Sequence, residues 1–325
     1  QGLANIEVLN ASGYEVFVPG NNEGLTFPKA IFEKVIHQHA RFYVLGTNML
    51  DLRNGEIPKG MMSSVTIVKS GVRIGIIGLT ASFNDFYHPL GWDIHDPLEC
   101  ASQAVAQLRN EVDFLLVISH VGIHFDRRLA AAVPGIDYIV GGHTHHLLEH
   151  AERVEQTMIG AAGKFGTHLG LIEAEFDPLT NKLLTLRGSA VPTQDQPDDP
   201  KIKSIIDTHL HQSRITMNRE VTVLSAPLLH NYREESELGN LLAGGLRKWT
   251  GAEIAIVNSG QLLYGLQAGK QTDADLLAVC PSPINPCSIQ LQGSFIHQAL
   301  EEALLDEFIE QAIRGYGFRG KQLGT

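Results

Sequence analysis

The sequence predicts an α/β fold arranged in two domains, and three observations lead to this expectation. Over the first 190 residues, short apolar runs rich in β-branched side chains alternate with segments of helical period, the pattern of strands covered by helices. Residues 192–200, PTQDQPDDP, contain three prolines and three acids, which is the composition of an exposed linker. A length of 325 residues suits two domains of roughly 100–200 residues each.

The elements of the first domain follow from the period of its apolar residues. Short runs bounded by glycine or polar residues predict strands at 15–18, 42–45, 64–68, 73–78, 114–118 and 138–140. Apolar spacings of three and four residues predict helices at 2–10, 28–39, 97–110 and 127–133. We expect two hairpins, one that joins 64–68 to 73–78 and one that joins 157–161 to 168–176.

The second half of the chain predicts a smaller set of elements. We expect a connecting helix at 201–218, a helix at 237–250, a strand at 253–257, a helix at 293–313 broken near Asp306, and a glycine-rich end at 315–320. The expected domains are therefore 1–192 and 220–325, joined by a linker and connecting helix at 193–219. The chain is expected to be a fragment whose natural start lies before Gln1 and whose second domain is incomplete.

The charge and residue usage exclude several classes of protein. Lys and Arg number 25 against 36 Asp and Glu, a net charge of −11, whereas nucleic-acid binding needs clustered basic side chains. No window approaches the ~18 apolar residues of a transmembrane helix, so no membrane partner is expected. The three cysteines form no CxxC pair, and their sparse use favours a cytoplasmic location. The 15 histidines suit transition-metal binding.

Polar side chains follow three of the predicted strands. The run 114–118 leads into His120, the run 138–140 leads through two glycines into His143 and His145, and the run 15–18 leads into Asn21. Ligands in open α/β sheets collect at the carboxyl ends of strands. In an extended loop, the rings of His143 and His145 would point to one side, toward neighbouring metals. A single such histidine is commonly a hydrogen-bonded loop residue, so the recurrence at three strand ends is what favours metal ligation.

These strand ends carry a family resemblance. The segments Gly20-Asn21-Asn22-Glu23, Ser119-His120-Val121-Gly122 and Gly141-Gly142-His143-Thr144-His145 resemble the GNHE, SHxG and GGHTH motifs of calcineurin-like dinuclear metallophosphoesterases, and of their 5'-nucleotidase family most closely. The segments 237–243, 250–255, 258–260 and 281–293 resemble the carboxyl-terminal substrate domain of that family. The motifs GNNEG and PxPINPC are similar to those of a bacterial YunD-like subgroup. The resemblance implies an α/β/β/α sandwich followed by a smaller α/β substrate domain.

The resemblance also implies residue roles. Asn21, His120 and His143 would ligate one divalent metal ion and His145 a second, the metals being Mn, Zn, Co or Mg. Asn258 and Gly260 would contact the substrate. Asn22 occupies the place of the GNHE histidine, and an amide donates a hydrogen bond but transfers no proton near neutral pH. Activity toward poor leaving groups would then be reduced, unless His124, His146 or another residue supplies the proton.

The sequence departs from the family pattern in two further ways. The D-x-H motif and the bridging aspartate of the family would lie upstream of Gln1, so three ligands are expected to be absent and metal binding to be weak. Leu263 and Ser282 stand where relatives carry an arginine and an aromatic residue, so the sequence does not support a base sandwich unless Tyr264, Phe318 or residues beyond the given sequence provide it.

The expected function is metal-dependent hydrolysis of a phosphate ester, with a nucleotide as the default small-molecule substrate. The class would be a 5'-nucleotidase, a 2',3'-cyclic phosphodiesterase or a UDP-sugar hydrolase, acting in nucleotide catabolism. The alternative is a catalytically silent or regulatory ligand-binding protein on the same fold, which the missing carboxylates and Asn22 favour. The sequence leaves the oligomeric state open.

Overall fold

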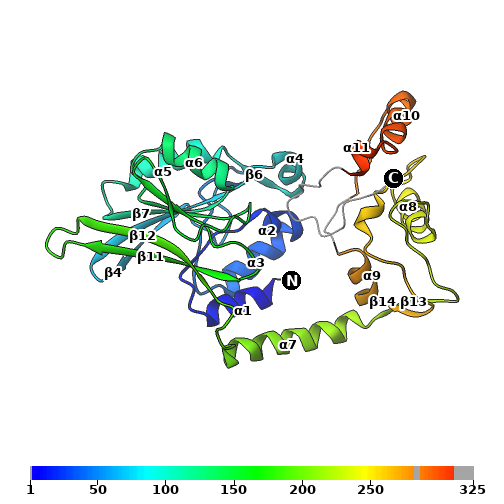
Figure 1. The fold of residues 1–325 in the computed structure, drawn as a ribbon, viewed down its shortest axis with the longest axis horizontal. Coiled ribbons are helices and arrows are strands. Elements are labelled where there is room, and N and C mark those ends of the chain that lie inside the picture. The colour runs from blue at the N-terminus through cyan, green and yellow to red at the C-terminus, as the bar shows by residue number, and fades with distance from the viewer. Residues whose placement is uncertain (1, 282–285, 311–325) are drawn as a thin grey trace. The chain divides into compact units, whose positions relative to one another are not determined.

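The computed structural model describes residues 2–281 and 286–310 of the chain. The described chain forms two compact units, a first unit of residues 1–207 and a second unit of residues 208–325. Figure 1 shows the ribbon of both. Within each unit the elements are held by their own packing.

A six-stranded mixed sheet lies at the centre of the first unit. Its strand order is β4-β5-β7-β8-β10-β9. The inner strands β5, β7, β8 and β10 are parallel, and the two edge strands run antiparallel to their neighbours. The strands are β4 (Ser64–Lys69), β5 (Val72–Thr80), β7 (Phe114–His120), β8 (Tyr138–Gly141), β10 (Thr157–Gly160) and β9 (Glu152–Val154). The parallel strands therefore bring their carboxyl ends to one edge of the sheet.

The two faces of this sheet are covered by different layers. Helices α5 (Pro97–Leu108) and α6 (Ile123–Ala132) cover one face, where their apolar residues pack on Leu115 and Val117 of β7 (Figure 1). The other face carries the neighbouring β7 residues Phe114, Leu116 and Ile118. Since successive side chains of a strand point to opposite faces, β7 is apolar throughout because both of its faces are buried.

Two short sheets cover the second face of the central sheet. One pairs β1 (Val16–Phe17) with β2 (Tyr43–Val44), and the other pairs β11 (His168–Phe176) with β12 (Leu183–Pro192). Helices α1, α2 and α3 pack outside the β1–β2 pair in a cluster that includes Phe32, Ile36 and the fully buried Trp92. The bounds of these helices are Leu3–Ala11, Asn21–Thr26 and Lys29–His39. The expected α/β/β/α layering of the first domain is confirmed.

Small elements close the edges of the first unit. Strands β3 and β6 form an antiparallel pair, with bounds Met49–Asp51 and Trp92–Ile94. Helix α4 and the 3-10 turn η1 lie next to β6, with bounds Asn84–Tyr87 and His88–Leu90.

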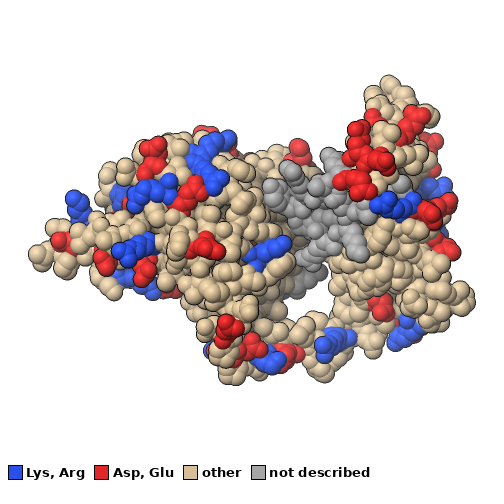
Figure 2. Space-filling model, in the orientation of Figure 1, with Lys and Arg blue, Asp and Glu red and all other residues tan. Residues whose placement is uncertain are grey.

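The second unit is a mixed α/β structure with a small core. Strands β13 (Glu220–Leu224) and β14 (Gly269–Thr272) pair antiparallel, and the core residues are Leu238, Leu262, Leu266 and Val279. Helix α7 (Pro200–Met217) begins in the first unit and continues into the second. The other helical elements of the second unit are α8 (Glu237–Thr250), η2 (Ser259–Gln261), α9 (Asp273–Val279), α10 (Gly293–Glu302) and α11 (Asp306–Ile309). Acidic side chains gather over α10 and α11 in the view of Figure 2.

Several sequence expectations need correction. The hairpin of 157–161 with 168–176 is wrong: β10 is buried between β8 and β9 in the central sheet, and β11 pairs with β12 instead. Residues 253–257 form no strand, because no described segment pairs with them and Ile254 and Ile256 are exposed. By contrast, the break expected near Asp306 in the helix at 293–313 is confirmed, since α10 ends at Glu302 and α11 begins at Asp306; residues 311–313 and the glycine-rich end lie outside the described residues.

The start of α6 also differs from the expectation of 127–133. The helix begins at Ile123, directly after Gly122. The Thr144 hydroxyl oxygen accepts a hydrogen bond from the Ile123 N–H at 3.1 Å. This cap comes from 21 residues away, so the local sequence gives no sign of the helix start.

Within the described ranges, no helix combines the length and the apolar character needed to cross a lipid bilayer.

Candidate metal centre

The strand ends of the central sheet bring together residues that are far apart in the sequence. His120 is the last residue of β7, and it lies on the face opposite Ser119 because strand side chains alternate. This face is the one that carries the β1–β2 pair, and α2 begins there with Asn21. His143 follows the last residue of β8 by two positions. Parallel pairing of β7 with β8 places both histidines at the same edge.

Three side-chain atoms converge at this edge, and we call them the donor triangle. Asn21 Oδ1 lies 2.9 Å from His120 Nε2 and 3.1 Å from His143 Nδ1, and the two ring nitrogens lie 3.3 Å apart. The side chains come from three separate elements, α2, β7 and the loop after β8. Asn21 and His143 are only 4% and 5% exposed. Three of the four residues singled out as ligands therefore meet at one point.

The donor triangle fits a divalent cation. Ligand atoms about 2.1 Å from a metal, separated by tetrahedral or octahedral angles, lie roughly 2.9–3.4 Å from one another. The three observed separations fall in this range. Two imidazole nitrogens and one amide oxygen are donors that borderline metals accept. A cation that lies just off the plane of these three atoms could therefore be about 2.1 Å from each of them.

The protonation of the two histidines also suits ligation. Burial, followed by the nearby charges of His143 and His145, lowers the pKa of His120 to about 4. Burial first, and then His145, lowers the pKa of His143. Both rings are therefore neutral near pH 7, and a neutral imidazole has the free electron pair that a metal binds.

Glycine at position 20 is required by the approach of His120. A Cβ atom placed there would lie 2.7 Å from His120 Cε1, closer than van der Waals contact allows. The residue has φ −80°, an ordinary value, so the requirement is one of space. Gly20 thus lets the start of α2 come against the ring of His120.

His145 and Asn22 lie next to the donor triangle but are not part of it. His145 is exposed, and the expected extended loop is wrong, because His143 and His145 both have left-handed backbone, with φ 66° and 55°. The charge of His145 acts on His120 and His143, which places it nearby. Asn22 is exposed on α2. Among the residues that the structure describes, no cluster of three or more His, Cys, Asp or Glu could hold a metal.

The residues expected to contact substrate lie in the second unit. Asn258 Oδ1 accepts a hydrogen bond from the Gly260 N–H at 2.7 Å, which caps the short helix η2. Gly260 is buried and Tyr264 is half exposed. Asn258 and Gly260 therefore form one local turn, and their role toward a substrate stays a prediction. Ser282 and Phe318 lie outside the described residues.

Sequence reasoning missed two residues near the strand ends. Asp126 of α6 is completely buried, and its Oδ1 accepts a hydrogen bond from the Ser119 hydroxyl at 2.5 Å. Phe83 lies against His143, with ring centroids 5.8 Å apart. Neither sits in a recognisable motif: an acid in the first turn of a helix is common, and a phenylalanine is ordinary core.

The chain is similar to phosphoesterases in sequence. Residues 215–317 match the family described as 5'-nucleotidase, C-terminal domain. The chain is 32% identical to the uncharacterized metallophosphoesterase YunD of Bacillus subtilis (strain 168), over 99% of this chain and 70% of that protein. It is 26% identical to the trifunctional nucleotide phosphoesterase protein YfkN of the same organism, over 93% of this chain but only 24% of that protein.

Solved structures agree on the fold. The 5'-nucleotidase precursor of Thermus thermophilus matches with a TM-score of 0.61 and 25% identity, over 86% of this chain and 60% of that one. A putative 5'-nucleotidase of Staphylococcus aureus matches with a TM-score of 0.69 and 16% identity, over 98% and 68%. The chain belongs to the 5'-nucleotidase family of calcineurin-like metallophosphoesterases, whose members are hydrolases of phosphate esters.

Proposed function

We propose that the chain supplies metal ligands to a metal-dependent phosphoesterase that hydrolyses a nucleotide. The observation that carries the proposal is the donor triangle, in which two neutral imidazoles and an amide oxygen lie at the separations expected for ligands of one metal ion. Asn21, His120 and His143 would hold one divalent cation, and His145 would serve a second. When bound, such cations supply a nucleophile at neutral pH and neutralise the charge of a phosphoryl group.

The chain's own residues would orient the substrate and exclude water from the cation. Asn21 and His143 are buried, so the cation would be held from the protein side. The exposed Asn22 follows Asn21 on α2, and its amide would donate a hydrogen bond to a phosphoryl oxygen. An amide gives no proton to a leaving group, so esters with good leaving groups should react fastest.

A nucleotide is the substrate class that the relatives favour. YfkN is named a trifunctional nucleotide phosphoesterase, and the Thermus thermophilus neighbour is a 5'-nucleotidase precursor. The turn formed by Asn258 and Gly260 would offer polar groups to the base or ribose. The net charge of −11 makes bound cations the natural counterpart of an anionic phosphate. A cytoplasmic location stays part of the proposal.

A second candidate is a silent or regulatory ligand-binding protein on the same fold. It is favoured by the position of Asn22 and by the composition of the donor triangle, which contains no carboxylate. Such a protein would bind a cation and a nucleotide without hydrolysis.

The test combines metal analysis with hydrolysis assays on the full natural chain. We expect two equivalents of Mn²⁺ or Zn²⁺ and cleavage of at least one of 5'-AMP, 2',3'-cyclic AMP, UDP-glucose and p-nitrophenyl phosphate. His143→Ala should lose both, and Asn22→His should raise turnover of the poorer leaving groups by about 10-fold or more. A protein that binds two metals but cleaves none of these would support the binding alternative.

A further inference from the structure

Asp126 is a buried carboxyl group whose place in the fold needs an explanation. It lies in the first turn of α6 with no exposed surface. Its Oδ1 accepts the hydrogen bond from Ser119, but its Oδ2 is buried and has no hydrogen-bond partner among the described residues. Among the described residues, no Lys or Arg forms a salt bridge with Asp126. Isolated buried carboxyl groups are costly, so this one is expected to have a purpose.

The carboxyl group of Asp126 contacts the ends of two strands at once. Ser119 of β7 and Gly141 of β8 are paired in register. Ser119 donates its hydroxyl to Asp126, and a Cβ at Gly141 would lie 2.7 Å from Asp126 Oδ2. Gly141 therefore has no side chain because the carboxyl group fills that space. One side chain from α6 thus spans the carboxyl ends of both strands.

These two contacts lie directly behind the donor triangle. Ser119 precedes His120 in β7, and strand alternation turns the hydroxyl toward α6 and the imidazole toward α2. Gly141 precedes His143 by two residues, through a second glycine. A shift of either strand end relative to the other would change the 3.3 Å separation of the two ring nitrogens.

We propose that Asp126 is a positioning residue of the metal centre, which ties the ends of β7 and β8 together from the α6 side and so holds His120 and His143 at coordination distance. Burial raises the pKa of Asp126 to about 7, and among the described residues no Lys or Arg forms an ion pair with its carboxyl group. The inference rests on the proposed metal function of the donor triangle. Partners that orient ligands from behind commonly change metal affinity 10–100-fold.

The variant Asp126→Asn tests the proposal with little change of shape. The amide oxygen still accepts the Ser119 hydroxyl, whereas the amide N–H groups face the unpartnered space beside Gly141. We expect Co²⁺ affinity, measured by calorimetry on the full chain, to fall about 10-fold. The visible spectrum of bound Co²⁺, which reports ligand geometry, should change as well.

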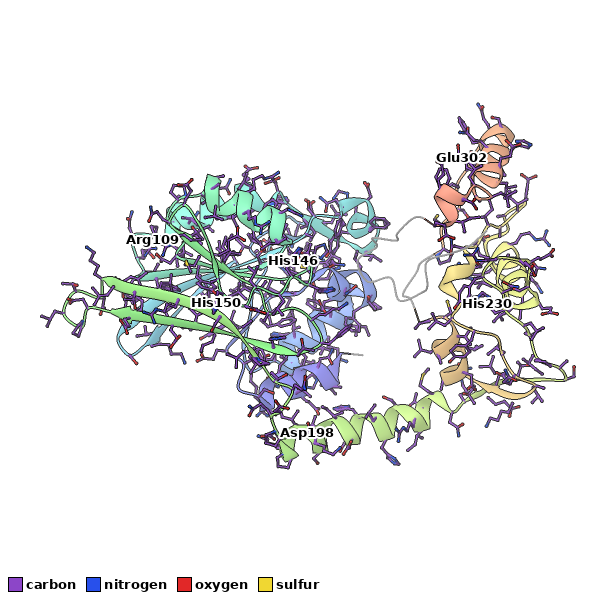
Figure 3. All side chains as sticks on the ribbon, viewed as in Figure 1. Arg109, His146, His150, Asp198, His230 and Glu302 are labelled. Atoms are coloured by element: carbon purple, nitrogen blue, oxygen red, sulfur yellow. The ribbon has the colours of Figure 1, made fainter. Side chains whose placement is uncertain are left out.

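Asp137→Asn is the matched control. Asp137 also anchors β7, but at its amino end: Oδ2 accepts the Leu115 N–H at 2.7 Å and the Arg109 Nη1–H at 2.6 Å. Figure 3 shows Arg109 at one end of the first unit's sheet and His146, from the loop after β8, toward the other. The control should lower the free energy of unfolding, because it weakens the bonds that Arg109 and Leu115 donate, yet leave Co²⁺ affinity and spectrum unchanged.

The outcomes separate the two proposals. A wild-type chain that binds no cation overturns the metal centre, and the positioning role with it. A wild type that binds Co²⁺, beside an Asp126→Asn variant of equal affinity and spectrum, overturns the role of Asp126 alone. Equal losses in Asp126→Asn and Asp137→Asn would also overturn it, because stability alone would explain them. If Asp126→Asn fails to fold, Ser119→Ala removes the hydrogen bond between β7 and Asp126 instead, and it should weaken Co²⁺ binding about 3-fold.

Discussion

The two ends of strand β7 are built from similar residue types but treat charge in opposite ways. At the amino end, Arg73 Nη2 donates to Asp113 at 2.8 Å, and Arg109 pairs with Asp137 at 2.6 Å. At the carboxyl end, no described Lys or Arg forms an ion pair with Asp126, and the three residues of the donor triangle include no acid. The amino end is satisfied within the chain, whereas the carboxyl end is suited to a cation from outside.

The pKa values express the same difference. Hydrogen bonds from Arg73 lower the pKa of Asp113 to about 2, while burial raises that of Asp126 to about 7. The first aspartate stabilises the fold in its charged form. The second opposes folding when it is charged, and such residues are concentrated at functional sites. The amino end of β7 is therefore stabilised by ion pairs, whereas the carboxyl end carries the buried polar groups of the candidate metal centre.

The largest effect is expected from His143→Ala. Removing one of three donors should weaken Co²⁺ or Mn²⁺ binding at least about 100-fold, more than the loss of a supporting partner. Calorimetry on the purified protein measures the affinity. His150→Ala, an exposed histidine beyond the loop, is the control and should leave the affinity unchanged. If His143→Ala bound the cation as tightly as wild type, the carboxyl end of β7 would no longer be distinguished from the amino end as a metal centre.

A smaller loss is expected from Gly20→Ala. The added Cβ would push the His120 ring away from Asn21, because it would lie 2.7 Å from Cε1. We expect cation affinity to fall about 10-fold, again by calorimetry. Gly244→Ala in α8 adds the same methyl group where nothing lies within 4 Å. It should gain up to about 1 kcal/mol of stability and leave affinity unchanged; if Gly20→Ala bound cations as well as wild type, close packing at His120 would not matter.

The pH dependence of unfolding should distinguish the two aspartates in the metal-free protein. The folded pKa of Asp126 is raised from 3.8, so its unfolded form ionises first and stability falls as pH rises from about 4 to about 7. The folded pKa of Asp113 is lowered, so its contribution is present above pH 4 and is lost as pH falls toward about 2. In urea unfolding, Asp126→Asn should therefore lose the fall in stability between about pH 4 and pH 7. Asp113→Asn should lose the fall in stability below about pH 4. If the two aspartates changed stability with pH in the same direction, the contrast between the two ends of β7 would be wrong.

The smallest effect is expected from His145→Ala. His145 is exposed and contributes no atom to the donor triangle, so the first cation should bind with an affinity within about 3-fold of wild type. The second equivalent should weaken more. A titration with Mn²⁺ followed by electron paramagnetic resonance resolves the two steps. A loss as large as that of His143→Ala would place His145 in the first site.

Much of the fold follows from local sequence pattern. Strands β7 and β8 are continuous apolar runs because both of their faces are buried, and α8 was expected with its observed bounds of Glu237–Thr250. The failures concern long-range pairing. Nothing in 157–161 distinguishes a hairpin partner from a place inside the sheet, and the cap that starts α6 comes from Thr144.

The donor triangle was predictable in its residues but not in its geometry. Asn21, His120 and His143 all follow apolar runs, and their convergence follows from parallel strand ends. Asp126 was not predictable, because its role depends on Ser119 and Gly141, which the fold brings to it from two strands. The place of Asn22 and His145 beside the triangle depends on backbone turns that motif spacing does not determine.

The most direct test of the account is anomalous diffraction from crystals of the protein grown with MnCl₂. The account predicts an anomalous peak about 2.0–2.3 Å from Asn21 Oδ1, His120 Nε2 and His143 Nδ1 together. A peak held by other residues, or no peak at these three atoms at saturating Mn²⁺, would contradict the assignment of this strand edge as the metal centre.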